Sequence, residues 1–408
     1  MGKKLMGRRD FMKSSIAGLG SYVYLSSNEK KPEKNQREGK FIYRTLGQTG
    51  IRVPVIGMGM LQSSNPALVR AALDAGISHF DTTAMQSVQQ NNLKMFSDVT
   101  KGRPRESFII GVKVSFLRMQ EQGLYKEGVT TEAFLKSFDF YLKSLNMEYV
   151  DILYHHAVSR KESVFYEPIM KAMEKAKKDG KTRFLGISSH ANVAEAVQAA
   201  ADSNFYEVVM AAYTFKQKNY LQVREAIAKA ANAGLGVVAI KVIRGGEQPD
   251  TMAGIHGLKE GEKAVNPRAC LKWALQDPNV HATVPAFDTF DDMNVDLSVM
   301  DDLTLTDPEK EDLKRAASTA GLYCQGCGQC VRQCIAKLPI PELMRAYMYT
   351  YGYRKPSLRQ EVVVSLGLPS HVCEDCSQCP VKCLNGWSVS YKIRDIVRLR
   401  DVPSQFLT

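Results

Sequence analysis

The feature that most constrains the fold of this chain is a repeated alternation of strand and helix between residues 41 and 318. Eight short apolar runs have the length and composition of buried β-strands. Segments with the apolar period of an amphipathic helix lie between them. The predicted strands are 55–59, 78–81, 108–114, 150–156, 183–188, 207–213, 236–242 and 281–284. Eight strand–helix units predict an α/β fold, a (β/α)8 TIM barrel.

An open, doubly wound sheet is the alternative to the barrel. Such a sheet usually carries a G-x-G-x-x-G turn after its first strand. The first predicted strand here ends with Gly-Met-Gly-Met at residues 57–60, and no third glycine follows. The turn signals Gly47 and Gly50 also predict a hairpin ahead of this strand.

Polar residues at the ends of the predicted strands are the candidates for a site, because barrel enzymes place their active residues there. They are Asp81, Lys113, His155, His156, Ser188, Ser189, His190 and Lys241. A lone charge on an apolar strand is costly and is usually paired, so we expect Asp81 and Lys113 to form an ion pair, a site, or both. His155 has the opposite parity to His156, and we expect it to point outward as a structural residue.

These segments resemble the aldo/keto reductase family over about residues 41–318. The matching strings are RTLGQTG, PVIGMG, HFDTTA, the lysine of the third strand, YVDILYHH, GKTRFLGISSH and the closing LTDPEKEDLKRAA. The resemblance implies carbonyl reduction with NADPH by an Asp, Tyr, Lys and His tetrad. Asp81, Lys113 and His156 match three of its members, and Gln86 occupies the tyrosine position. An amide donates hydrogen bonds but gives no proton to an alkoxide, which leaves His156 or a water as the proton source.

The resemblance also implies cofactor contacts, and several of them differ here. Ser188 matches the first nicotinamide contact, whereas Ser189 and Met210 replace an Asn and a Gln, and Lys241 is a further candidate contact. Where the family often has a basic residue for the 2′-phosphate, this chain has four acidic ones. They are Asp288, Asp291, Asp292 and Asp296. Carboxylates repel a phosphate, so NADH, another organic ligand or no nicotinamide are alternatives to NADPH.

Eight of the nine cysteines lie in two runs with identical C-x2-C-x2-C-x3-C spacing. The first run is Cys324, Cys327, Cys330 and Cys334, and the second is Cys373, Cys376, Cys379 and Cys383. This is the spacing by which bacterial ferredoxins bind [4Fe–4S] clusters. Disulfides and two zinc sites are the alternatives. The ninth, Cys270, is expected to pack in the barrel core.

The likeness to two-cluster ferredoxins implies that the fourth cysteine of each run binds the other cluster. One set would be Cys324, Cys327, Cys330 and Cys383, and the other Cys373, Cys376, Cys379 and Cys334. We expect the segment between the runs to be helical and to dock on the barrel. Residues 319–408 are therefore predicted to form a small α-rich, two-cluster ferredoxin-like domain.

The first 27 residues resemble a twin-arginine export signal. Arg8 and Arg9 precede Phe11, Met12 and Lys13, and a short, weakly apolar stretch follows. This implies export, either to the periplasm or to a membrane surface held by an uncleaved signal; a disordered basic tail is the alternative. Residues 28–40 are charged and predict a solvated linker. Apart from this signal, no apolar run approaches the roughly 18 residues of a membrane span.

The formal net charge of +11 raises the question of a nucleic-acid partner. Residues 1–40 hold ten Lys or Arg against four Asp or Glu, and residues 323–408 hold eleven against six. The 282 residues between them hold 33 of each sign. Because the barrel is neutral, we expect no nucleic-acid partner.

The chain is therefore predicted to be an exported oxidoreductase that couples chemistry at the barrel mouth to two [4Fe–4S] clusters. Its substrate would be a small carbonyl or hydroxyl compound, with an electron-transfer protein as a further partner. The alternatives are an NAD(P)H-dependent carbonyl reductase with structural clusters, an electron-transfer protein whose barrel only binds a partner, and a barrel that keeps ligand binding alone.

Overall fold

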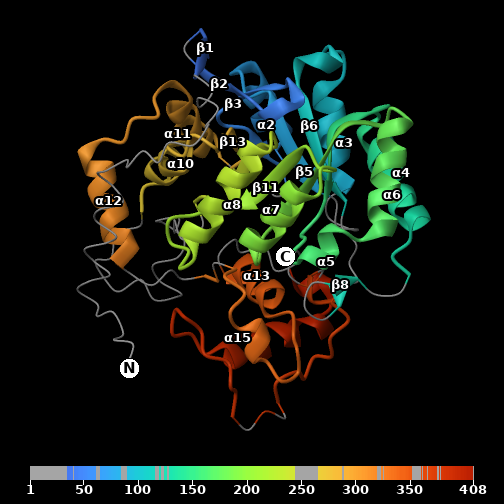
Figure 1. The fold of residues 1–408 in the computed structure, drawn as a ribbon, viewed down its shortest axis with the longest axis vertical. Helices are drawn as coiled ribbons and strands as arrows, with labels where there is room; N and C mark the ends of the chain where they lie inside the picture. Colours follow the sequence, from blue (N-terminus) through green and yellow to red (C-terminus); the bar gives the residue numbers. More distant parts are fainter. Residues whose placement is uncertain are drawn as a thin grey trace. The chain divides into compact units, whose positions relative to one another are not determined.

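The fold is taken from a computed structural model (Figure 1). It describes residues 35–39, 41–60, 65–83, 90–114, 119–120, 124–125, 128–243, 265–286, 289–318, 323–324, 326–351, 360, 362–364, 366–374, 376 and 378–407. The predicted signal segment 1–27, Gln86 and Asp288 lie outside these residues. Contacts divide the chain into two units, Met1–Pro32 and Glu33–Thr408, and every described residue belongs to the second.

One parallel sheet of eight strands forms the centre of this unit. Its order is β13-β12-β11-β10-β9-β6-β5-β4. The strands are β4 (Met58–Gly59), β5 (His79–Thr83), β6 (Ile109–Val114), β9 (Val150–His155), β10 (Thr182–Ser189), β11 (Val208–Ala212), β12 (Gly236–Ile240) and β13 (Ala282–Thr283). A parallel bridge between Ile56 and Thr283 joins the two edges of the sheet. All eight predicted strands are present, and the sheet closes as a barrel does, so the open-sheet alternative is excluded.

Helices connect successive strands, as the apolar periods predict. They are α2 (Pro66–Asp74), α3 (Gln90–Thr100), α4 (Thr131–Leu145), α5 (Lys161–Val164), α6 (Glu167–Lys178), α7 (Val193–Asp202), α8 (Tyr220–Asn232), α10 (Pro267–Leu275), α11 (Phe290–Asp301) and α12 (Asp307–Ser318). Local sequence sets several boundaries. Asn65 and Asn266 cap α2 and α10 just before a proline, and Asn146 ends α4 in the left-handed conformation.

A three-stranded antiparallel sheet precedes the barrel. It consists of β1 (Gln36–Glu38), β2 (Phe41–Thr45) and β3 (Arg52–Pro54). The turn between β2 and β3 reaches the start of β12, where Gln48 donates a backbone hydrogen bond of 2.8 Å to Gly234. The predicted hairpin is thus confirmed, and it lies at the amino-terminal end of the barrel strands. The outer strand β1 of this sheet is formed by residues that were predicted to lie in the polar linker 28–40.

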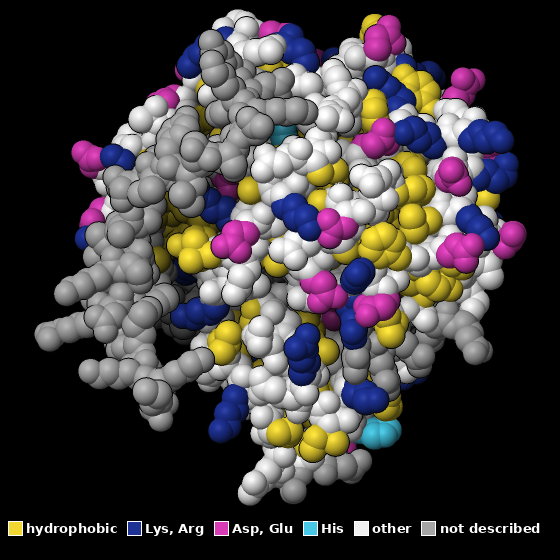
Figure 2. Space-filling view, viewed as in Figure 1, with side chains coloured by type: hydrophobic (Ala, Val, Ile, Leu, Met, Phe, Trp, Pro, Cys, Tyr) yellow, Lys and Arg dark blue, Asp and Glu magenta, His cyan; other side chains and the backbone are white. Residues whose placement is uncertain are grey.

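The C-terminal residues have an apolar core of their own. Helices α13 (Ile340–Tyr351) and α15 (Val389–Val397) pack together and bury Leu343, Val363 and Ile396, separately from the barrel core. In Figure 1 these orange-to-red elements gather below α7 and α8. On the face shown in Figure 2, basic and acidic side chains are interspersed over the barrel. Within the described part of the chain, no helix has the length and apolar character needed to span a membrane.

Candidate functional site

Asp81 and Lys113 form an ion pair inside the barrel. Asp81 lies on β5 and Lys113 two positions further up the neighbouring β6, so both side chains point into the same interior. The Asp81 side chain is 1 % exposed and the Lys113 side chain 12 %. Burial lowers the pKa of Lys113, and the adjacent carboxylate opposes this by favouring the ammonium form. The pair is therefore a buried charge pair next to the barrel mouth.

Gly111 leaves the space that this pair occupies. A Cβ atom at Gly111 would lie 3.0 Å from the Asp81 carboxylate and 2.8 Å from the ring of Tyr154. The Tyr154 ring therefore packs beside the pair, and burial raises the pKa of its hydroxyl. Met210 closes another side, because its sulfur lies 3.9 Å from the Lys113 ammonium.

His156 follows β9 and is held by the end of β10. Its Nδ1 lies 2.7 Å from the hydroxyl oxygen of Ser188, which also accepts a 3.1 Å hydrogen bond from the Ala157 amide. Burial lowers the pKa of His156 well below its usual range, and the nearby cations Lys113, Arg345 and Lys241 lower it further. The imidazole is therefore neutral at physiological pH and is oriented by the Ser188 hydroxyl.

The two neighbouring histidines have different surroundings. The His190 ring lies perpendicular to the His156 ring, with centroids 5.4 Å apart, so it belongs to the mouth. His155 stacks on Tyr125 and hydrogen-bonds to its hydroxyl. A second tyrosine hydroxyl, that of Tyr206, lies 3.4 Å from His155 Nδ1. His155 therefore lies outside the barrel sheet, as its parity predicts.

The predicted nicotinamide contacts are engaged within the protein. Ser188 holds His156, and the Ser189 hydroxyl donates to the Ala191 carbonyl at 3.2 Å. Met210 offers no amide, and the Lys241 ammonium lies 5.7 Å from the ring centre of Tyr349 on α13. Ser188 thus keeps the residue type of the contact that the resemblance implies, whereas Ser189 and Met210 lack the amide groups of the other two.

The acidic residues after the last strand organise helix α11. Asp292 and Thr289 form a reciprocal capping box at its first turn, and Asp291 lies exposed beside them. Asp296 points into the core and is 3 % exposed, and its Oδ2 has no hydrogen-bond partner in the described part of the structure. Burial, and then the nearby Asp292, raise the pKa of Asp296 well above its usual range. This helix start thus presents carboxylates where the family often presents a basic residue.

The loop of the first cysteine run packs directly against the carboxyl end of β10. The Asn192 amide donates a 3.2 Å hydrogen bond to the Gly326 carbonyl. A Cβ atom at Gly326 would lie 2.3 Å from the His190 carbonyl oxygen. A small pocket at this contact is lined by His190 of the barrel and by Cys324, Glu342 and Arg345. The C-terminal domain therefore covers the same end of the barrel as the polar site, as expected for the docking segment.

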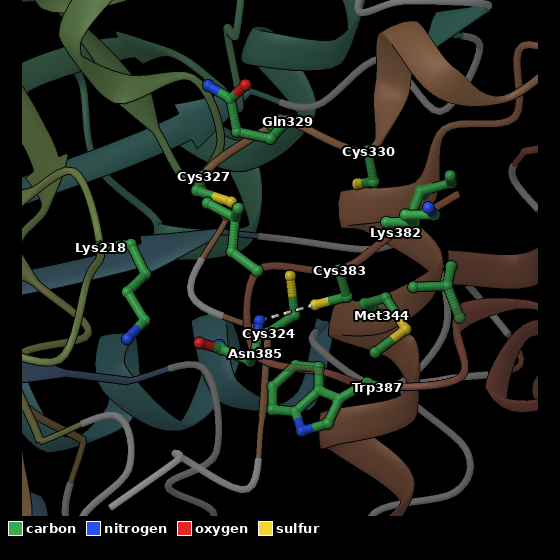
Figure 3. Close-up of a pocket in the computed structure, with 14 residues that line it drawn as sticks. Lys218, Cys324, Cys327, Gln329, Cys330, Met344, Lys382, Cys383, Asn385 and Trp387 are labelled. Atoms are coloured by element: carbon green, nitrogen blue, oxygen red, sulfur yellow. Dashed lines mark hydrogen bonds between the residues drawn. The ribbon is translucent and has the colours of Figure 1, made fainter. Parts of the chain in front are cut away.

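Four cysteines from the two runs surround one cavity. Figure 3 shows the sulfurs of Cys324, Cys327, Cys330 and Cys383 turned toward a common space, and all four residues line it. Burial and then its three companions raise the pKa of the Cys330 thiol. The backbone amides of Gly326 and Asn385 each donate a 3.4 Å hydrogen bond to a sulfur, to Cys324 and Cys383 respectively. This is the first set that the ferredoxin spacing implied.

The other four cysteines also lie close together. Burial, and then the nearby Cys334, Cys376 and Cys379, raise the pKa of the Cys373 thiol to about 11. Gln333 connects the two runs, because it accepts a 2.7 Å hydrogen bond from the Lys382 amide. The fold thus brings the fourth cysteine of each run to the other run. The two cysteine sets were predicted from spacing alone, without knowledge of the contact between Gln333 and Lys382.

No disulfide joins any of the nine cysteines, all of which are described. Cys270 is 1 % exposed on α10, which confirms its predicted place in the core. Among the described residues, no group of three or more His, Cys, Asp or Glu side chains is arranged to hold a metal ion. Around one tetrahedral ion, thiolate sulfurs lie about 3.8 Å apart. In a [4Fe–4S] site, each thiolate binds a different iron, which requires a wider arrangement.

Two residues of the mouth, Glu342 and Arg345, were not predicted as site residues, and a third, His190, was a strand-end candidate without an assigned role. His190 was visible at a strand end but had no match in the family tetrad. Glu342 and Arg345 lie in the segment between the cysteine runs, where only helical periodicity could be recognised. The i, i+3 spacing of the two charges on one helix face was the available signal, but it did not show which surface that face would meet.

Comparison with known proteins identifies the barrel. A sequence model of the aldo/keto reductase family matches residues 56–317. The L-glyceraldehyde 3-phosphate reductase of Escherichia coli is 30% identical over 168 residues, 38% of this chain and 47% of the relative. The L-galactose dehydrogenase of Arabidopsis thaliana is 33% identical over 165 residues, 36% of this chain and 49% of the relative. The matched region thus spans about half the length of these curated relatives.

A solved structure supports the same fold. An aldo-keto reductase from Bacillus halodurans, in its holo form, is similar with a TM-score of 0.53 and 21% sequence identity. The likeness covers 70% of this chain and 98% of that structure.

We expect strong coupling between Asp81 and Lys113. Asp81→Asn and Lys113→Met should each lower the free energy of unfolding by about 3–5 kcal/mol, because each leaves one buried charge without its partner. The double variant should cost less than the sum of the two single variants. Urea unfolding of the four proteins measures this. The exposed pair Lys175 and Asp179 is the matched control, with a coupling of at most about 1 kcal/mol. Additive costs for the buried pair would contradict the assignment.

Asp296→Asn should stabilise the protein at neutral pH. A carboxyl whose pKa is higher in the folded state costs stability above its unfolded pKa of about 3.9, because the folded state holds a proton that the unfolded state has lost. The gain should be about 1–3 kcal/mol at pH 7 and vanish below about pH 4. Urea unfolding between pH 3.5 and 8 measures it, with Asp291→Asn on the exposed side of α11 as the control. A gain independent of pH would show that Asp296 is ionised in the folded protein.

Proposed function

This chain belongs to the aldo/keto reductase family, and from this premise we propose that it is an oxidoreductase that couples chemistry at the barrel mouth to two [4Fe–4S] clusters. The named relatives are a reductase and a dehydrogenase of small carbonyl and hydroxyl compounds. We propose a substrate of that class for this chain. Asp81, Lys113 and His156, at three positions of the family tetrad, form its binding site.

The observation that carries the proposal is the contact between the first cysteine run and the mouth. Cys324 and Gly326 belong to the loop that packs on His190, and the His190 ring is in contact with the His156 ring. One ligand of the proposed first cluster thus lies in the same small pocket as a residue of the mouth. A cluster that only stabilised the fold would not have to lie next to the barrel mouth. Electron transfer requires a short distance between the cluster and the substrate.

The two cysteine sets fit the proposed clusters. Each set has four thiols, drawn from both runs, and amide groups point at two sulfurs of the first set. When bound, the clusters would supply one-electron transfer, and two of them suffice for the two electrons of a carbonyl reduction. Amide hydrogen bonds to the sulfurs favour the reduced state by stabilising its extra negative charge.

The barrel residues have separable roles in this proposal. The neutral imidazole of His156, fixed by Ser188, orients the substrate oxygen by a hydrogen bond. Lys113 places a positive charge where negative charge develops on that oxygen. Because burial lowers the pKa of its ammonium group, Lys113 is also the described group best suited to release a proton there.

An NAD(P)H-dependent carbonyl reductase with structural clusters is the second candidate, and the three retained tetrad positions favour it. Against it, the predicted nicotinamide contacts are engaged within the protein. Fluorescence titration with NADH and NADPH distinguishes the two candidates, because only the second requires a nucleotide to bind.

We further propose export by the twin-arginine route. The supporting observation is the order of Arg8, Arg9, Phe11 and Lys13 ahead of a weakly apolar stretch. That route carries folded proteins with their cofactors, which suits a protein that acquires clusters before export. Replacing both arginines by lysine in the native host should retain the protein in the cytoplasm, as measured by cell fractionation.

The reconstituted protein should contain about eight irons and eight sulfides per chain and show a visible absorption that dithionite bleaches reversibly. Cys383→Ser should remove about half of the iron, and so should Cys334→Ser, because each fourth cysteine serves the set of the other run. Cys270→Ala is the matched control and should keep all of it. A colourless protein loaded with zinc would contradict the clusters.

Gly326→Ala should uncouple the first cysteine run from the barrel. The added methyl group would meet the His190 carbonyl at 2.3 Å, whereas in Gly328→Ala the nearest atom is at 3.7 Å. Both glycines have φ near +70°, so both variants bear the same backbone cost of about 1–2 kcal/mol. Only Gly326→Ala should speed hydrogen exchange at the Asn192 amide and slow reoxidation of dithionite-reduced clusters by model aldehydes, with iron content unchanged. Equal behaviour of the two variants would contradict coupling through this contact.

A further inference from the structure

One face of helix α13 supplies the barrel mouth with residues from outside the barrel. Glu342 and Arg345 line the small pocket with His190 and Cys324. Tyr349 lies one turn further along the same face, beneath the ammonium group of Lys241. The residues at i, i+3 and i+7 of this helix thus meet the carboxyl ends of β10 and β12. Residues of the barrel and residues of the C-terminal domain, which have separate hydrophobic cores, therefore both line the mouth.

The charged groups acting on the mouth are mainly positive. Among the described residues, the charged groups that lower the pKa of His156 are the cations Lys113, Arg345 and Lys241. The Asp81 carboxylate is occupied by Lys113. Burial raises the pKa of Glu342, and the positive charge of the adjacent Arg345 lowers it, so among the described groups three cations at the mouth face the two carboxyls of Asp81 and Glu342. An anion entering this mouth would meet an excess of positive charge.

Two cations, Arg345 on α13 and Lys241 directly after β12, both act on His156 by their charge. Lys241 lies over Tyr349, which is four residues, or about 6 Å, along α13 from Arg345. A carboxylate or phosphate can accept hydrogen bonds from an arginine fork on one side and from an ammonium group on the other. The backbone of Lys241 also has a φ of +58°, which is unusual for a residue other than glycine. Such strained backbone conformations cluster at functional sites.

We infer that the mouth takes an anionic carbonyl compound, with its carboxylate or phosphate held by Arg345 and Lys241 and its carbonyl facing His156 and Lys113. The carbonyl half of this inference rests on the proposed function. The anionic half rests on the arrangement of α13 over β10 and β12. The C-terminal domain thus acts on substrate choice as well as on electron supply.

Binding of matched probes to the reconstituted full chain tests the anionic half without turnover. Pyruvate and diacetyl have similar shapes, but only pyruvate carries a carboxylate. Isothermal titration should show at least tenfold tighter binding of pyruvate than of diacetyl, weakening as salt is raised. Arg345→Met and Lys241→Met should each weaken pyruvate binding about 10- to 100-fold, the range expected for a charged hydrogen bond, and leave diacetyl binding unchanged.

Exposed cations away from the mouth serve as controls. Arg70→Met on α2 and Lys175→Met on α6 make the same chemical changes and should not alter pyruvate binding. Arg345→Lys, which keeps the charge, should recover part of the lost affinity. Iron content and circular dichroism of each variant check that the C-terminal domain is still folded. A second pair of probes, glyceraldehyde 3-phosphate and glyceraldehyde, tells whether phosphate or carboxylate is the preferred anion.

The outcomes separate this inference from the proposed function. Equal affinity for pyruvate and diacetyl, or unchanged pyruvate binding in folded Arg345→Met, overturns the anion site even if reduced clusters turn over neutral aldehydes. A selective anion site in a protein whose reduced clusters are not reoxidised supports the inference and overturns the coupling. Tight NADPH binding that is lost in the same two variants, without preference for pyruvate, assigns the cations to a nucleotide and overturns the inference.

Discussion

The closure of one parallel sheet is the constraint on which the rest of this structure depends. The bridge between Ile56 and Thr283 leaves the sheet without a free edge, so all eight strands deliver their carboxyl ends to one rim. Asp81 and Lys113 lie on adjacent strands at that rim, and His156 and Ser188 follow on the next two. An open sheet of the same strands would spread these residues along an edge. In the barrel they converge on a single interior.

The second determining contact is the one between the cysteine loop and the end of β10. A backbone hydrogen bond from Asn192 to Gly326, and the close approach of Gly326 to His190, leave little freedom in how the two parts meet. This contact sets the position of Cys324 and, through α13, the positions of Glu342 and Arg345. The proposed electron supply and the proposed anion site thus both depend on this interface. A change that loosens the loop should affect both.

The departures from the family pattern have a common physical consequence. Ser188, which the resemblance implied as a nicotinamide contact, orients a histidine, Asp292 caps α11, and Asp296 is buried in it. Ser189, Met210 and the acidic residues replace groups that the resemblance implied as contacts of a dinucleotide. The clusters proposed for the cysteine domain would supply electrons at the same rim. The protein keeps the polar centre of the barrel, while several residues around it depart from the family pattern.

The sequence by itself determined the local elements, the barrel class and the identity of most polar residues at the rim. Apolar periods and strand-end positions are local properties, so eight strands, the hairpin, the buried Cys270 and the outward His155 could all be predicted from them. Cysteine spacing likewise indicated two sets of ligands. Only the tertiary structure decided which surface α13 covers, that Ser188 serves His156, and that Arg345 and Lys241 act on one mouth. Those facts depend on contacts between segments more than 30 residues apart, and no local pattern encodes the direction in which one folded core docks on another.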